Sequence, residues 1–414
     1  MIKQGIGLIS GVALALAAVT LPGPASMASP AQGVAAASAP VAWVVNQSLH
    51  SAKKGSVTPI DTATNTVITN IPVSRDAIAV ALSPGGKTAY LALKADNHLG
   101  AHGYVVPVNT TTYRKGKPVK AGTVPGTLLI TPNGKTLYAA DWLIGQVTPI
   151  DTTTHTAGRP IKTGADPFAV TMASTPDSRT VYVVNEEPYG TVTPIDTATN
   201  TAGKNIKVGV TPGPIVIAPD GKTAYVLNLA EGEPGKGTVT PIYTAANTAG
   251  KPIPIPHAAF PLALNLMVIT PNGKTLYVVG STTLTPIDTA TNTARRAIRV
   301  APRNGFDITT VITPDGRTVY VGGAVSGTSP RGFIVPVSTA TGRAGKAIMI
   351  RGAPSVMAVT PDGKTLYVLC AGNVVAGAPQ DVVPVNTATN TAGRPINTGL
   401  QPTDIAIIGS QAGE

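Results

Sequence analysis

The stretch that decides the fold is Thr191-Val-Thr-Pro-Ile-Asp-Thr-Ala-Thr-Asn200, because close copies of it recur along most of the chain. Its proline stands at eight positions, 42 to 50 residues apart: Pro59, Pro107, Pro149, Pro194, Pro241, Pro286, Pro336 and Pro384. A second phrase, Thr360-Pro-Asp-Gly-Lys-Thr-Leu-Tyr367, alternates with the first and recurs seven times, with its tyrosine at Tyr90, Tyr138, Tyr182, Tyr225, Tyr277, Tyr320 and Tyr367. A period of this length is typical of repeat proteins whose units stack on one another.

Each unit predicts four short β-strands, here called a to d. Strand a, such as residues 307–312, ends in Pro-Asp/Asn-Gly, which makes a tight turn into strand b, such as residues 180–185. A loop of variable length leads to strand c, residues 190–195 in the same unit, and the Asp-Thr-Ala-Thr-Asn turn leads to strand d, residues 204–208. Alternating Val or Ile with Thr or Tyr suits half-buried strands. The predicted fold is an all-β propeller of four-stranded blades.

The chain resembles the YVTN family of β-propeller repeats. The residues that carry the resemblance are Tyr182-Val-Val-Asn185, Gly190-Thr-Val-Thr-Pro-Ile-Asp-Thr-Ala-Thr-Asn-Thr201 and Pro361-Asp-Gly-Lys364, and it covers roughly residues 41–409. The chain departs from the family pattern in two ways. The Val before Ile-Asp is Pro in every copy, which we expect at the frayed end of strand c. The Asn after Tyr-Val-x is kept in few blades, and Cys370 takes its place in the last one.

The number of blades follows from how the chain begins and ends. The first unit opens at strand b, residues 42–46, and the last segment, residues 403–408, is a strand a without its turn. Eight complete blades form only if this last strand joins the first blade, which would also hide two exposed sheet edges. The resemblance implies seven blades as the alternative. We favour eight, with the ring closed by the C-terminal strand.

Composition excludes several other classes of protein. Gly and Pro together make up 82 of 414 residues while 43% of residues are hydrophobic, which excludes both a disordered chain and a helical bundle. The lone Cys370 excludes a disulfide framework and any site with several cysteine ligands. It is expected to pack as a small apolar residue. No cofactor and no metal site are predicted.

The N-terminal region has the pattern of an exported protein. Lys3, the apolar run of residues 5–21 and small residues before Ala28 predict a secretory signal peptide over residues 1–28. Residues 29–40 are predicted to be an Ala/Ser/Pro-rich linker, residues 41–409 one propeller domain, and residues 410–414 a polar tail. The expected protein is therefore secreted, without a transmembrane anchor, and monomeric.

The b–c loops differ from blade to blade, whereas the a–b and c–d turns are nearly identical. In a propeller the b–c and d–a loops emerge on one face, so the diversity on that face favours a binding surface there. The residues that we expect to contact a ligand, on account of their charge or aromatic character, are His98, His102, Trp142, Glu186, Glu187, Tyr189 and Arg331. The principal hypothesis is a non-catalytic binding or scaffold protein with a protein or small-molecule partner.

Two alternatives remain open. The net charge of +11 suggests binding of a polyanion such as nucleic acid or a cell-wall polymer. However, seven basic residues repeat in the a–b turn and seven begin strand d, where charge prevents edge-to-edge aggregation. The second alternative is an enzyme of lactonase or lyase type, built on acids near the channel mouth at the start of strand a: Asp76, Asp166, Asp307 and Asp404.

Overall fold

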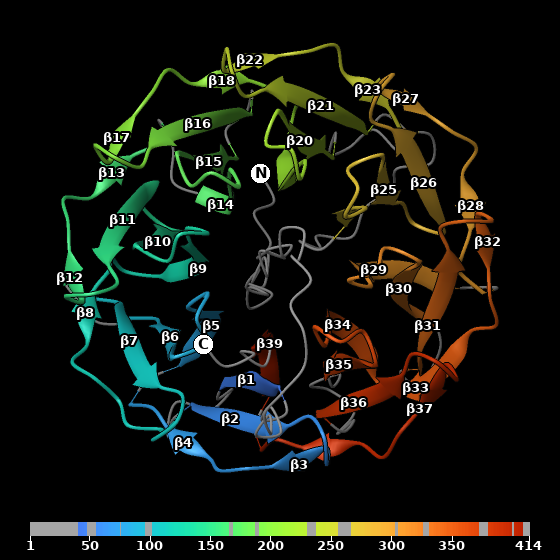
Figure 1. Cartoon of the computed structure of the whole chain (residues 1–414), viewed down its shortest axis with the longest axis horizontal. Coiled ribbons are helices and arrows are strands. Elements are labelled where there is room, and N and C mark those ends of the chain that lie inside the picture. Colours follow the sequence, from blue (N-terminus) through green and yellow to red (C-terminus); the bar gives the residue numbers. More distant parts are fainter. Residues whose placement is uncertain are drawn as a thin grey trace, which may run out of the picture.

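The computed structural model describes residues 40–47, 55–74, 76–95, 102–164, 169–186, 190–229, 237–255, 266–302, 305–325, 331–371, 380–399 and 401–408. The expected signal peptide, the expected tail and all of the expected linker except Pro40 lie outside this set. Within it the strands form eight separate antiparallel sheets arranged around a central axis, as the blades of a propeller (Figure 1). The predicted all-β fold with eight blades is therefore confirmed.

The innermost strand a of blades 1 to 8 is, in order, β39 (Gln401–Ile408), β5 (Ala77–Leu82), β9 (Pro125–Ile130), β14 (Ala169–Ser174), β19 (Pro212–Ile217), β24 (Met267–Ile269), β29 (Gly305–Ile312) and β34 (Ala353–Val359). Strand b follows as β1 (Val41–Gln47), β6 (Thr88–Leu93), β10 (Thr136–Asp141), β15 (Thr180–Asn185), β20 (Thr223–Asn228), β25 (Thr275–Val279), β30 (Thr318–Val325) and β35 (Thr365–Ala371).

Strand c of blades 1 to 8 is β2 (Ser56–Asp61), β7 (Tyr104–Asn109), β11 (Gln146–Asp151), β16 (Thr191–Asp196), β21 (Thr238–Tyr243), β26 (Thr283–Asp288), β31 (Arg331–Ser338) and β36 (Asp381–Asn386). In blade 2 the outer strand d is the single piece β8 (Val119–Lys120). In the other blades it consists of two pieces: β3 (Thr66–Val67) and β4 (Ile71–Pro72), β12 (Thr156–Ala157) and β13 (Ile161–Lys162), β17 (Thr201–Ala202) and β18 (Ile206–Lys207), β22 (Thr248–Ala249) and β23 (Ile253–Pro254), β27 (Thr293–Ala294) and β28 (Ile298–Arg299), β32 (Arg343–Ala344) and β33 (Ile348–Arg351), and β37 (Thr391–Ala392) and β38 (Ile396–Asn397).

The ring closes through the C-terminal strand, as predicted. β39 pairs antiparallel with β1, and Val44 lies opposite Ile405. Blade 1 therefore takes its inner strand from the C-terminus and its other strands from the N-terminus of the ring, and β39 and β1 lie side by side in Figure 1. This arrangement gives both strands a hydrogen-bonding partner that neither would have in an open chain.

The repeated proline lies in the middle of strand c, so the prediction that it occupies a frayed end is wrong. In β16, Pro194 lies opposite Tyr182, and its carbonyl accepts a hydrogen bond of 2.7 Å from Gly203 N on the outer side. The N–H and C=O of one residue point to the same side of a strand, so the donor that proline lacks would have faced strand d. Of the predicted strand d, residues 204–208, only Ile206–Lys207 (β18) is a strand, and a second short piece, β17, precedes it at Thr201–Ala202.

Packing between blades forms the core. Each blade contributes alternate side chains to each of its two faces, and these meet the next blade in buried apolar clusters. One such cluster joins Tyr138 and Val147 of blade 3 to Met172 and Val183 of blade 4. Cys370 is 1% exposed within the cluster of blades 7 and 8, and burial raises the pKa of its thiol to about 12. It packs as a small apolar residue, as predicted.

A tyrosine in strand b hydrogen-bonds to the c–d turn of the next blade. The Tyr182 hydroxyl donates to Asn247 Oδ1 at 2.6 Å, and Tyr367 makes the same contact with Asn65 at 2.5 Å across the ring closure. Asn247 has a φ of 50°, a left-handed conformation that asparagine tolerates better than most residues. The second repeated phrase thus supplies the donor and the first supplies the acceptor, which explains why the two phrases alternate.

Replacing Tyr182 with Phe is expected to lower the free energy of unfolding by about 1 kcal/mol, because it leaves the amide of Asn247 without this donor. Burial raises the pKa of Tyr182 to about 12, so its hydroxyl is still a donor at neutral pH. Urea unfolding followed by circular dichroism measures the change. The control is Tyr243→Phe, because the Tyr243 side chain is 44% exposed. Equal effects of the two substitutions would contradict the role of the inter-blade hydrogen bond.

Candidate functional site

The propeller has two faces with different chemistry. The a–b and c–d turns lie on one of them, here called the turn face. The b–c and d–a connections lie on the other, here called the loop face, because adjacent strands of every blade are antiparallel.

On the turn face the repeated polar side chains serve the fold. Asp177 Oδ1 accepts hydrogen bonds from Thr175 Oγ1 at 2.6 Å and from Arg179 N at 3.0 Å, and the Thr175 hydroxyl holds the pKa of this carboxyl below its usual range. Thr197 Oγ1 donates to Ser178 O at 2.6 Å, which ties the c–d turn to the a–b turn. A hollow of about 390 Å³ between blades 4 and 5 is lined by turn residues of both blades, among them Thr175, Asp177 and Arg179. The turn face therefore repeats one structural motif.

On the loop face, the residue three positions after the strand-b tyrosine, or after Trp43 in blade 1, fixes the d–a connection that leads into its own blade from the preceding one. Asn228 Oδ1 accepts a hydrogen bond from Gly209 N at 2.9 Å, and Asn46 Oδ1 accepts one from Thr398 Oγ1 at 2.8 Å. Asp141 has the same role in blade 3. One of its carboxylate oxygens accepts from Thr123 N and from Val124 N. The repeats indicate only in part that this position holds the d–a connection, since it is Asn in blades 1 and 5 and Asp in blade 3.

The hairpin between β10 and β11 in blade 3 is held rigidly. Asp141 Oδ1 accepts a hydrogen bond from Leu143 N at 2.8 Å, and Gly145 completes the turn with a φ of 56°. Trp142, predicted to contact a ligand, is half-buried, and its Nε1 donates to Thr127 Oγ1 at 3.0 Å. Its ring fills the space beside Gly126, where a Cβ would lie 2.1 Å from the indole. Trp142 thus anchors the hairpin to the inner strand.

The residues after Trp142 face solvent instead. Leu143 is 46% exposed and Ile144 is 44% exposed, two adjacent large apolar side chains at the tip of the hairpin. Sequence reasoning selected the tryptophan of this loop and missed its two neighbours. The run Asp141-Trp-Leu-Ile-Gly145 could have indicated them, because aliphatic residues are unusual in a tight turn.

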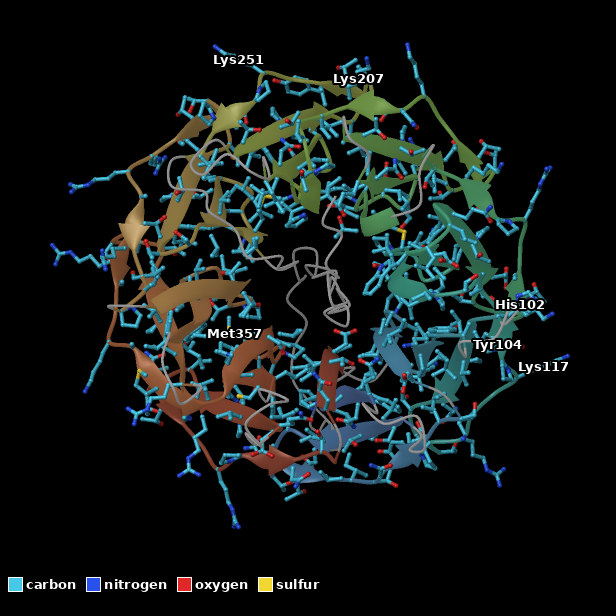
Figure 2. All side chains as sticks on the ribbon, turned by 180° about the vertical axis from the view of Figure 1, so that it is seen from behind. His102, Tyr104, Lys117, Lys207, Lys251 and Met357 are labelled. Carbon is cyan, nitrogen blue, oxygen red and sulfur yellow. The ribbon has the colours of Figure 1, made fainter. Side chains whose placement is uncertain are left out.

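The other predicted loop residues are spread around the ring. His102 is exposed and comes two residues before β7, and Figure 2 labels it near Tyr104. Glu186 directly follows β15 and is half-buried. Arg331 is exposed and is the first residue of β31. It was expected to lie in a b–c loop but belongs to the strand. His98, Glu187 and Tyr189 lie outside the described residues.

The acids predicted at the channel mouth have different environments. Asp76 precedes β5, and its Oδ2 lies 3.7 Å from Lys94 Nζ. Asp404 is fully buried in β39, and its Oδ2 accepts a hydrogen bond from Val80 N of blade 2 at 2.9 Å. Asp307 lies in β29, with only its backbone described, and Asp166 lies outside the described residues. The two acids whose side chains are described therefore already have protein partners.

Neither a metal centre nor a membrane-spanning helix is found in the described part of the chain. No group of three or more His, Cys, Asp or Glu side chains there could hold a metal ion. The same residues contain no helix of the length and apolar character needed to cross a bilayer.

Comparisons with known proteins show similarity at the level of the fold. No family model matches the sequence, and no curated protein matches it. A dihydro-heme d1 dehydrogenase, solved in complex with DHE, has a TM-score of 0.68 at 14% identity, over 94% of this chain and 79% of that one. The hydrazine synthase of Kuenenia stuttgartiensis has a TM-score of 0.57 at 20% identity, over 75% of this chain and 96% of that one.

A protein of unknown function from Desulfotomaculum acetoxidans has a TM-score of 0.55 at 14% identity, over 90% of this chain and 99% of its own. Two of these three structures are enzymes by name and the third has no assigned function. At such low identity the likeness shows the architecture and carries no chemistry from one chain to another. The chain is therefore an eight-bladed β-propeller in the part that the structure describes.

Proposed function

We propose that this chain is a secreted propeller of the YVTN type that binds a protein partner through its loop face, without turnover. The observation that carries the proposal is the hairpin of blade 3, which presents Leu143 and Ile144 to solvent. The export signal and the repeated phrases of the sequence support the cellular location and the family.

A rigid hairpin is a favourable place for a binding anchor. Leu143 and Ile144 are each a little under half exposed, so burying the rest of either side chain in an apolar pocket of a partner contributes on the order of 1 kcal/mol. Association also costs conformational entropy wherever a loop must be ordered. In blade 3 that cost is already reduced, because Asp141 holds the backbone of Leu143 and Trp142 is fixed against Gly126. The geometry therefore suits an apolar contact made without rearrangement.

The basic residues of strand d have a different placement. Lys117 and Lys251 are exposed and point outward from the rim of the ring in Figure 2. Charges spread around the outer edges favour a role in solubility, because outer strands with unpaired backbone groups would otherwise aggregate. We therefore place the specific binding surface on the loop face and not on the rim.

A photo-crosslinking amino acid at position 143 tests the proposal. In the secreted and cell-surface fraction of the producing cells, we expect a discrete adduct that disappears when Ile144→Ser is added. The matched control is position 67, because Val67 and Ile68 form another exposed apolar pair, 40% and 41% exposed, on the turn-face side of blade 1. Both substituted proteins should unfold within about 0.5 kcal/mol of wild type. No adduct at 143, or equal adducts at 143 and 67, would refute the proposal.

A further inference from the structure

Blade 7 differs from the other blades at its loop-face end. β30 and β31 are each eight residues long and β33 has four, whereas the corresponding strands of blades 3 to 5 have six and two. The extension adds two further sets of opposite residues across the sheet, and the outer of the two is, in order, Gly305, Val325, Arg331 and Arg351. This end of the blade carries two exposed arginines.

Arg331 and Arg351 lie directly opposite each other on adjacent antiparallel strands. Residues in this relation project from the same side of a sheet with Cβ atoms about 5 Å apart, and like charges placed so are destabilising. Neither guanidinium makes an ion pair among the described residues, and the sequence has no Asp or Glu between Asp315 and Asp362. The pair thus places two like charges side by side, and neither is neutralised by an ion pair among the described residues.

The sector that contains this pair is the most basic part of the chain. Residues 289–361 hold nine Lys or Arg and two Asp, a net charge of +7 out of +11 for the whole chain. Eight of the nine are arginine. Arginine binds oxyanions with two parallel hydrogen bonds from a planar fork, which lysine cannot do. The donor type therefore favours an oxyanion.

Val325, Gly305 and Met349, which are described neighbours of the pair in the sheet, carry no polar side chain. Val325, directly opposite Arg331, is half-buried, and Gly305, opposite Val325 on its other side, has no side chain. Met349 lies two residues before Arg351, on the same side of the sheet, and is 51% exposed.

We propose that Arg331 and Arg351 form a binding site for a single oxyanion group, a phosphate, sulfate or carboxylate, on the loop face of blade 7. The site refines the proposed binding face by naming the chemistry of one part of it. It does not depend on the blade 3 hairpin, which lies on the opposite side of the ring (Figure 1).

Isothermal titration of the full chain with inorganic phosphate, sulfate and succinate, at constant ionic strength set with chloride, tests this site. We expect saturable binding of at least one of the three, and the preferred ion identifies the source of the oxyanion. Arg331→Gln and Arg351→Gln should each weaken it about tenfold, the loss of one charge-assisted pair of hydrogen bonds. Arg351→Lys should weaken it nearly as much, because it keeps the charge and loses the fork.

The control is Arg299→Gln, which removes the same charge from the same sector where the opposite residue is Thr283. Its affinity should stay within about twofold of wild type. In the absence of anion, Arg351→Gln should leave the melting temperature unchanged or raise it, since it relieves repulsion. No saturable binding of any of the three anions, or an equal loss in Arg299→Gln, would overturn the site. Neither outcome would affect the crosslinking result at position 143.

Discussion

A chain that lacks residues 401–414 is expected to lose cooperative folding, because blade 1 loses its inner strand. β39 forms seven register pairs with β1 and buries Ile405 and Ala406 against neighbouring strands. Its removal exposes this apolar surface and leaves one edge of β1 unpaired next to an open ring. We expect a loss of at least about 5 kcal/mol, comparable to the whole stability of many domains.

Thermal unfolding followed by circular dichroism measures this effect. The control is a chain that lacks only residues 410–414, which keeps all of β39 and should melt as wild type does. A synthetic peptide of residues 401–408, added in excess to the truncated chain, should restore part of the transition by pairing with β1. If the chain without residues 401–414 melted at the temperature of the full chain, the ring closure would not contribute to stability.

The fold could be predicted largely because the sequence of one blade recurs eight times along the chain. The tyrosine and asparagine of the two alternating phrases meet between blades, and the orphan C-terminal strand had to complete blade 1. The position of Pro194 could not be judged in the same way. A strand tolerates a missing N–H only where that group would not be needed to pair with a neighbouring strand. The spacing of residues along the chain does not show in which direction the N–H would point.

The candidate site was less predictable, because exposure depends on tertiary packing. The sequence predicts Trp142 as a binding anchor. In the structure, however, its ring packs inward against Gly126, and Leu143 and Ile144 face solvent instead. Arg331 was selected because it borders an irregular b–c loop and because arginine is a favoured binding anchor. Its partner Arg351 is 20 residues away in sequence, and only the register of β31 and β33 brings them together.

Substitution of Asp404 can show whether this acid is structural or catalytic, because the two roles predict opposite effects on the free energy of unfolding. Asp404→Ala is expected to lower the free energy of unfolding by about 2–3 kcal/mol, since it leaves Val80 N buried without this acceptor at the junction of blades 1 and 2. An acid kept unpaired for catalysis would behave in the opposite way, because its replacement commonly stabilises a protein.

Urea unfolding of Asp404→Ala beside Asp76→Ala distinguishes the two roles. The Asp76 carboxylate is partly exposed and contacts Lys94 at 3.7 Å, so its loss should change the free energy of unfolding by less than about 1 kcal/mol. Asp404→Asn should fall between Asp404→Ala and wild type, because its carbonyl oxygen can still accept from Val80 N. An unchanged or higher stability of Asp404→Ala would show that this carboxylate is not needed for the junction, and would return it to the acids that an enzyme could use.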